Sequence, residues 1–264
     1  MIPLLFLILL CCSLLMLLAW KVQQSSGNST WVDVAWSFGT GAAGVALILA
    51  PPHAAPPGAR AAVVAIVAAL WSLRLGIHLL RRARAGRDDP RYAALKEQWG
   101  AAYRWKMPAF LQVQALSVFL LGGVIMLAGR NPAPGFGVLD GLAVLVAILS
   151  ILGEAIADLE VARFARDPAN RGKICEIGLW GWSRHPNYFC EWLIWVAFAL
   201  FATTGGGWFW LAWAGPVLMY LVLVHASGIP PTEAHMLESR GEAFRDYQRR
   251  VPKFCPRPPK DAAR

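Results

Sequence analysis

Long apolar stretches separated by short polar segments run through this chain. Most of them approach the ~20 residues that an α-helix needs to cross the hydrocarbon core of a bilayer. Their approximate bounds are 3–20, 34–50, 60–80, 110–129, 137–157, 187–204 and 207–226. Lipid offers no partner for open backbone groups, and the alternating pattern of a membrane β-barrel is absent. The pattern therefore predicts an all-α membrane bundle of about seven transmembrane helices.

The basic residues fall in alternate loops between these stretches. Of the 25 Lys and Arg residues, only Arg60 and Arg130 lie in loops of the opposite set, and Arg74 lies within a stretch. Because cytoplasmic loops carry the excess of Lys and Arg, we expect the N-terminus outside and the C-terminus in the cytoplasm. The first stretch has no basic residue before it, whereas Lys21 follows it, so a retained helix is favoured over a cleaved signal peptide.

The composition agrees with a membrane protein. Only 16% of the residues are charged, the mean hydropathy is +0.46, and 13 residues are Trp, which favours the headgroup region of a bilayer. The net charge of +9 sits in loops rather than on one soluble face, which argues against nucleic-acid binding. The five cysteines show neither CxxC nor zinc-ligand spacing, so neither a disulfide framework nor a metal site is expected.

The chain is expected to be one membrane domain, 1–264, that ends in a basic cytoplasmic tail at 231–264. Residues 233–251 are charged and predict a helix. Its apolar positions, Leu237, Phe244, Tyr247 and Val251, could lie on the membrane surface.

Several polar groups lie at membrane depth, where a charge costs several kcal/mol unless it is paired or hydrated. They are Asp33, Arg74, His78, Glu154, Asp158, Asn187 and Glu191. Arg74 and His78 are four residues apart and share a helical face. Two interpretations stay open for Arg74 and Glu154, a structural ion pair and a functional site. His78 is either a polar core residue or a proton donor.

A mixed-charge site is predicted near the basic fifth loop. Asp158, Asn187 and Glu191 fall near four basic residues, Arg166, Arg171, Lys173 and Arg184. Carboxylates can accept hydrogen bonds from ribose hydroxyl or amide groups, and guanidinium groups bind phosphate. No Ser–His–Asp arrangement, HExxH motif or Gly-rich phosphate loop appears, so a nucleotide would bind without a soluble Rossmann domain.

The segment from Gly178 to Glu191, GLWGWSRHPNYFCE, resembles the signature of the steroid 5-alpha-reductase-like superfamily. Over about residues 30–260 the chain resembles its bacterial branch of largely uncharacterised membrane reductases. The supporting segments are 33–36, 74–78, 86–92, 154–158, 172–173, 227–230 and 247–250.

This resemblance implies a multi-pass protein of the bacterial inner membrane that acts in lipid metabolism, and a monomer is the expected state. The helices of about 1–130 would enclose a lipid-like enone, and those of about 137–230 would bind NADPH, whose hydride passes to the β-carbon. The implied cofactor-binding residues are Asp158, Arg166, Arg171, Lys173, Trp180, Arg184, Asn187, Tyr188, Glu191, Glu233 and Tyr247. The partners expected are a hydrophobic small-molecule substrate and membrane lipids.

The chain departs from the steroid 5-alpha-reductases in the group that polarises the ketone. Those enzymes use a Gln-Glu pair in the second span and a Tyr in the third, and neither stands at the matching place here. Four substitutes are predicted for this catalytic role: Asp33, Arg74, His78 and Tyr92.

Two other functions stay open. The isoprenylcysteine and phospholipid methyltransferases share an Arg-His-Pro-x-Tyr element, which Arg184 to Tyr188 match, so an S-adenosylmethionine-dependent membrane methyltransferase is the main alternative. A non-enzymatic lipid-binding or transport protein is the other, although it would leave the polar cytoplasmic site without a role. The Asn187-Tyr-x-x-Glu191 continuation favours the reductase.

Overall fold

The computed structural model describes residues 2–51, 58–86 and 88–258, and every regular element in these residues is a helix. Six segments are long and apolar enough to cross a membrane: Ile2–Ser26, Thr30–Leu49, Ala59–Arg84, Arg91–Gly129, Val138–Arg166 and Gly207–Arg240. The prediction of an all-α, multi-pass membrane protein is therefore confirmed. Of the segment 51–57 between the second and third predicted apolar stretches, which we expect to form a short outer loop, only Pro51 lies within the described residues.

The chain divides into two compact units. Unit 1 comprises Met1–Val144 and Ala197–Gly215, and unit 2 comprises Leu145–Val196 and Pro216–Arg264. The three boundaries between the units along the chain fall in α6 (Val138–Arg166), α7 (Pro186–Thr203) and α8 (Ala214–Leu221).

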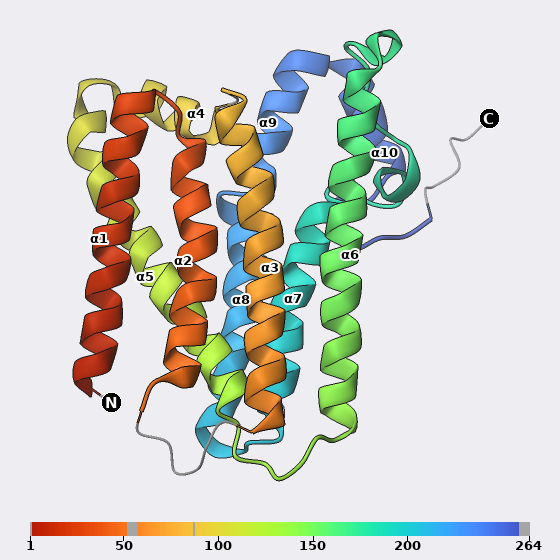
Figure 1. Cartoon of the computed structure of the whole chain (residues 1–264). Coiled ribbons are helices and arrows are strands. Elements are labelled where there is room, and N and C mark those ends of the chain that lie inside the picture. The colour runs from red at the N-terminus through yellow and green to blue at the C-terminus, as the bar shows by residue number, and fades with distance from the viewer. Residues whose placement is uncertain (1, 52–57, 87, 259–264) are drawn as a thin grey trace. The chain divides into compact units, whose positions relative to one another are not determined.

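Unit 1 is built mainly from the first five α-helices (Figure 1). They are α1 (Ile2–Ser26), α2 (Thr30–Leu49), α3 (Ala59–Arg84), α4 (Pro90–Trp99) and α5 (Tyr103–Gly129), with the 3₁₀ turns η1 (Gly100–Ala102) and η4 (Gly207–Trp213). Helix α2 packs against α1, α3 and α5, which makes it the central helix of the unit.

Glycines bring α2 close to its neighbours. A Cβ atom at Gly44 would lie 2.7 Å from the Ile125 side chain of α5, and one at Gly76 of α3 would lie 2.5 Å from the Phe38 ring of α2. Small residues allow such close approach of helix backbones, the usual way in which membrane helices pack.

The lipid-facing character of α1 is visible in its exposed side chains. Phe6, Leu10, Leu14 and Leu18 follow one another at four-residue spacing, and each is more than half exposed. An apolar stripe of this length on a helix suits contact with acyl chains rather than with water. The opposite side of α1 carries Met16, which is fully buried in the core of the unit.

A buried ion pair fixes the start of α3 to the start of α6. Arg60 binds Asp140 through two nitrogens, Nε to Oδ1 at 2.7 Å and Nη2 to Oδ2 at 2.9 Å. The same guanidinium donates to the backbone carbonyls of Ala133 and Gly135, at 2.6 and 2.7 Å. Such complete hydrogen bonding is what a buried pair needs to offset its desolvation.

Unit 2 holds the C-terminal helices and much of α6 (Val138–Arg166) and α7 (Pro186–Thr203). The others are η2 (Pro168–Asn170), η3 (Gly178–Gly181), α8 (Ala214–Leu221), the π-helical turn η5 (Val222–Ala226), α9 (Ile229–Arg240) and α10 (Glu242–Arg250). The predicted span at 187–204 coincides with α7. It is helical, but Asn187 and Glu191 lower its mean hydropathy, and it is not among the six membrane-capable segments.

The predicted position of the C-terminal helix on the membrane surface is wrong for three of its apolar residues. Phe244, Tyr247 and Val251 are almost fully buried and form a small core with Ile174 and Leu237. Helix α10 turns its apolar face inward because the segment after α6 supplies a partner for it. The polar face of α10 remains exposed.

Candidate functional site

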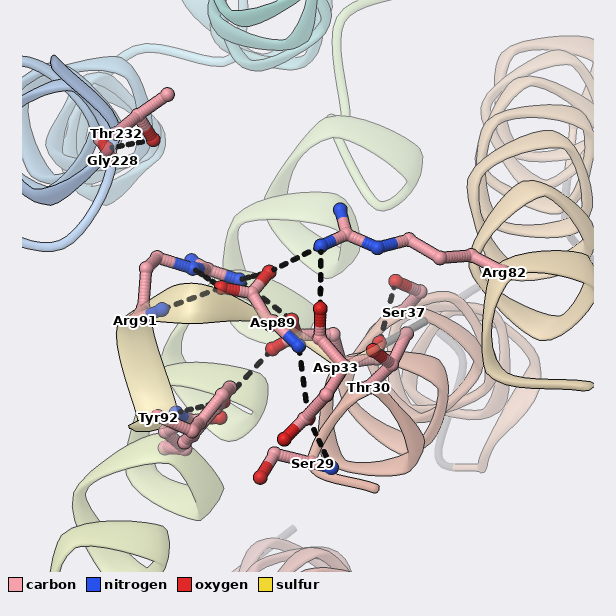
Figure 2. Close-up of polar contacts among 12 residues, drawn as sticks. Ser29, Thr30, Asp33, Ser37, Arg82, Asp89, Arg91, Tyr92, Gly228 and Thr232 are labelled. Atoms are coloured by element: carbon pink, nitrogen blue, oxygen red, sulfur yellow. Dashed lines mark hydrogen bonds and ion pairs between the residues drawn. The ribbon is translucent and has the colours of Figure 1, made fainter. Parts of the chain in front are cut away.

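A compact polar cluster in unit 1 joins the start of α2 to the first turn of α4 (Figure 2). The Asp33 carboxylate accepts two hydrogen bonds there. Arg91 donates from Nη2 to Oδ2 at 2.6 Å, and the Tyr92 hydroxyl donates to Oδ1 at 2.9 Å. Two of the four residues predicted to polarise a carbonyl, Asp33 and Tyr92, are therefore in direct contact.

The local sequence explains why α4 presents Arg91 and Tyr92 together. Asp89 caps the helix, accepting from the Arg91 backbone N–H at 2.9 Å, and Pro90 occupies the first helical position. Asp89 also accepts from Arg91 Nε at 2.9 Å, and Arg82 of α3 approaches it to 3.4 Å. The side chain that starts the helix thus also positions its first arginine.

The charges of the cluster balance, since two carboxylates face two guanidinium groups. The Asp33 side chain is 15% exposed and that of Asp89 8%. Burial alone would raise the pKa of Asp89, but the charge and hydrogen bonds of Arg91 outweigh burial and hold the pKa below its usual value. A buried carboxylate is tolerated when its charge is compensated in this way.

Helix α5 completes the surroundings of the Tyr92 hydroxyl. Gln114 donates from Nε2 to Tyr92 Oη at 3.1 Å. One turn further along α5, Ser117 donates to the Gln114 carbonyl at 2.7 Å and accepts from the Trp36 indole N–H at 2.9 Å. One polar contact thus joins α5 to Tyr92 of α4, and another joins it to α2 near Asp33.

The other two predicted polarising residues, Arg74 and His78, lie on α3 one helical turn apart. Arg74 is half-buried and His78 is exposed. Their catalytic role stays a prediction. The sequence-based reasoning missed Asp89, Arg91 and Gln114 as members of the cluster. The Asp-Pro pair before α4, a recognisable helix start, was the signal that could have placed Arg91 beside Asp89.

A second buried cluster lies in unit 2 and centres on Arg184, which precedes α7. Its Nε donates to Glu233 Oε1 of α9 at 2.8 Å, and its Nη1 donates to the backbone carbonyls of Gln248 and Val251, at 3.1 and 2.6 Å. The Gln248 amide donates to the other Glu233 oxygen at 2.8 Å. Two residues predicted to bind cofactor, Arg184 and Glu233, are thus paired with each other.

His185 belongs to the same cluster. Its Nε2 lies 3.0 Å from Glu233 Oε1, and its ring stacks on Tyr188 with centroids 5.5 Å apart. Burial lowers the pKa of the His185 imidazole, although the hydrogen bond to Glu233 opposes this effect and the Arg184 charge adds to it. The imidazole is therefore held mainly in its neutral form at pH 7.

The segment 247–257 holds the loop before α7 in place. The Tyr247 hydroxyl donates to the Trp180 carbonyl at 2.6 Å, and the Trp180 indole donates to the Ala157 carbonyl of α6 at 2.9 Å. Ser183 donates to the Phe254 carbonyl, and the Arg184 backbone N–H to that of Pro252, at 2.8 and 2.9 Å. Trp180 and Tyr247, both predicted to line the cofactor pocket, are therefore in contact.

The remaining residues predicted to bind cofactor differ in exposure. Arg166, Arg171 and Lys173 are exposed between the end of α6 and η3. Asp158, Asn187 and Tyr188 are half-buried, and Glu191 is buried: these four lie on α6 or α7. Tyr188 Oη also lies 3.5 Å from Thr232 Oγ1 of α9.

Residues 19–251 match the profile of a protein family of unknown function, DUF1295, and this range contains both clusters. The chain belongs to the DUF1295 family. A relative of this DUF1295 chain, an uncharacterized protein of Schizosaccharomyces pombe, is 27% identical to it over 270 residues. That alignment covers 90% of this chain and 75% of the relative. No solved structure matches the chain significantly.

Proposed function

We propose that this protein is an NADPH-dependent membrane reductase that transfers hydride to the C=C bond of a lipid-like enone, steroid-like or isoprenoid. One observation carries the proposal. A tyrosine hydroxyl, buried within an apolar helical unit, is hydrogen-bonded at 2.9 Å to a carboxylate whose charge an arginine compensates. A tyrosine held in this way is suited to keep its proton near a substrate carbonyl oxygen in a site with little water.

The chemistry of enone reduction explains why Tyr92 suits this role. Hydride addition to the β-carbon moves negative charge onto the carbonyl oxygen, and a hydrogen-bond donor aimed at that oxygen lowers the barrier. Tyr92 would turn its hydroxyl proton from Asp33 to the substrate oxygen. Asp33 keeps the Arg91 hydrogen bond at Oδ2 while this occurs, so its charge stays compensated.

The residues of unit 2 fit a dinucleotide phosphate by their chemistry. The exposed cations Arg166, Arg171 and Lys173 could bind phosphates, and among the described residues none of the three forms an ion pair. The half-buried side chains of Asp158 and Asn187 would form hydrogen bonds with ribose hydroxyl and amide groups. When bound, the reduced nicotinamide would supply the hydride.

Arg184 is placed differently from these cations. Its hydrogen bonds to Glu233 and to two backbone carbonyls occupy Nε and Nη1, so any phosphate contact would have to use Nη2. We therefore assign Arg184 mainly to holding the loop before α7. Its role as a phosphate ligand stays a prediction.

The motif from Gly178 to Glu191 supports the same proposal, because it resembles the signature of the steroid 5-alpha-reductase-like superfamily. We further propose the orientation that the basic loops indicate, with the N-terminus outside and the C-terminus in the cytoplasm of a bacterial inner membrane. The exposed cations of the loop at 163–173 would then face the compartment that contains NADPH.

Ligand-dependent thermal stability of the purified protein in detergent tests the cofactor. NADPH at 100 times its Kd should stabilise the folded protein by about 2.7 kcal/mol. Stabilisation by S-adenosylmethionine and not by NADPH would support the methyltransferase instead. Stabilisation by neither ligand would contradict both enzymatic proposals.

Catalysis is tested by following NADPH oxidation with two probes, a 3-keto-4-ene steroid and a polyprenyl enone. Product with a saturated C=C bond and an intact ketone is the expected result. A carbonyl reduced to an alcohol, with the C=C bond retained, would contradict the proposed reaction.

A further inference from the structure

The hydrogen-bond chain of unit 1 extends beyond the carboxylate and the tyrosine. It runs from the Gln114 amide to Tyr92 Oη at 3.1 Å, and from that hydroxyl to Asp33 Oδ1 at 2.9 Å. The Arg91 guanidinium closes it at 2.6 Å on the other carboxylate oxygen. Each of these four residues comes from α2, α4 or α5.

The direction of the Gln114 contact follows from the number of protons that Tyr92 carries. A phenol has one O–H, and here the carboxylate Asp33 can only accept it. The phenol oxygen must therefore accept from Gln114, which requires the amide nitrogen of Gln114 to face Tyr92. Amide nitrogen and oxygen are alike in shape, so the hydrogen-bond network is what assigns this orientation.

We propose that Gln114 is a positioning residue that makes Tyr92 a stronger hydrogen-bond donor to the substrate oxygen. This inference rests on the proposed function. An N–H that points at the phenol oxygen stabilises the negative charge that grows there as the proton moves toward a substrate carbonyl. Successive hydrogen bonds in a chain polarise one another, by roughly 10–30% per bond.

The position of Gln114 is itself fixed. Ser117 donates to the backbone carbonyl of Gln114 and accepts from the indole N–H of Trp36, which lies three residues after Asp33 on α2. The Trp36 ring meets the buried Trp71 ring edge-on, with centroids 6.4 Å apart. The backbone that carries Gln114 and the helix that carries Asp33 are thus joined by packed helices rather than by a loop.

Helix α5 supplies a matched control for this role. Gln112 stands two residues from Gln114, is also half-buried and also forms one side-chain hydrogen bond, but its partner is Ser13 of α1 at 2.6 Å. Gln112→Leu therefore removes a comparable helix-to-helix contact without touching Tyr92. Gln114→Leu removes the donor, and Gln114→Glu replaces it with an acceptor of the same size.

The first measurement needs no substrate. The five tyrosines are labelled with 3-fluorotyrosine, and the ¹⁹F resonance that disappears in Tyr92→Phe is assigned to Tyr92. Gln114→Leu should move this resonance, because it removes the N–H that points at the phenol oxygen, and Gln114→Glu should move it further. Gln112→Leu should leave it unchanged. A Tyr92 resonance at the wild-type position in Gln114→Leu would overturn the proposal, as would an equal change in Gln112→Leu.

The second measurement uses the enone probes. Gln114→Leu should lower kcat about ten-fold, the rate equivalent of about 1.4 kcal/mol, with KM nearly unchanged and with the NADPH-induced thermal shift intact. A fall of the same size in Gln112→Leu would indicate a merely structural contact and overturn the assignment. Wild-type protein that reduces neither probe would count against the proposed function alone, because the ¹⁹F resonance position still decides the Gln114 contact.

Discussion

Each unit buries an arginine–carboxylate pair, and the two pairs differ in the other groups to which they are hydrogen-bonded. In unit 2, Arg184 donates to Glu233 and to two backbone carbonyls, and Glu233 accepts from His185 and Gln248 as well. In unit 1, Asp33 accepts from Arg91 and from the Tyr92 hydroxyl, which carries a transferable proton.

This difference separates two uses of the same residue types. A guanidinium that binds backbone carbonyls fixes the path of the chain, as Arg60 also does in unit 1. A carboxylate that accepts from a phenol holds a proton in place. We therefore expect substitutions at Tyr92 to affect chiefly activity and substitutions at Arg184 to affect chiefly stability.

The largest effect is expected from Tyr92→Phe. It removes one hydroxyl and keeps the ring, so enone reduction should fall by about 10²–10⁴-fold, while stability changes by only about 1 kcal/mol. Steady-state rates and thermal unfolding of the same preparation measure the two quantities. Tyr103→Phe is the control, since Tyr103 accepts from Gln23 at 2.7 Å in the same unit but does not contact Asp33 among its described bonds. Equal losses of activity in both variants would remove Tyr92 from the catalytic role.

Hydropathy predicted most of the helices because a membrane span leaves a long, nearly continuous apolar pattern. Asp33 could be identified because a charge at membrane depth is costly. Arg91 and Gln114 could not, since their roles depend on α4 folding back on α2 and on the rotation of α5. No local pattern encodes those two tertiary contacts.

The same limit applies to unit 2. The motif drew attention to Arg184, but its carboxylate partner lies 49 residues further along the chain. The inward packing of Phe244 and Tyr247 was missed for a related reason. An amphipathic helix has one apolar face whether it meets lipid or protein, and only the folded chain reveals the Ile174 side chain that meets it here.

The second prediction concerns stability. Arg184→Met should destabilise the protein by about 3–5 kcal/mol, because it leaves the buried Glu233 carboxylate without its guanidinium and two backbone carbonyls without a donor. Thermal unfolding in detergent measures the loss, and limited proteolysis should show earlier cleavage within 247–257. Arg249→Met serves as the control, since the pair of Arg249 with Glu242 is exposed to solvent and contributes little. A melting temperature of Arg184→Met that matches that control would show that the cluster does not hold the C-terminal segment.

The smallest effect is a pH dependence that should come from unit 2. The pKa of His185 is lowered in the folded protein, chiefly by burial, whereas the unfolded chain should protonate near the ordinary value of about 6.5. The unfolded state therefore binds the proton more readily, and stability should fall as pH drops below about 6.5, by at most about 1.4 kcal/mol per pH unit for one proton. Melting temperatures between pH 7.5 and 5.5 measure this slope. His185→Gln should flatten it, and the control His235→Gln, on the exposed side of α9, should leave it intact. A slope that survives His185→Gln would assign the proton uptake to another group.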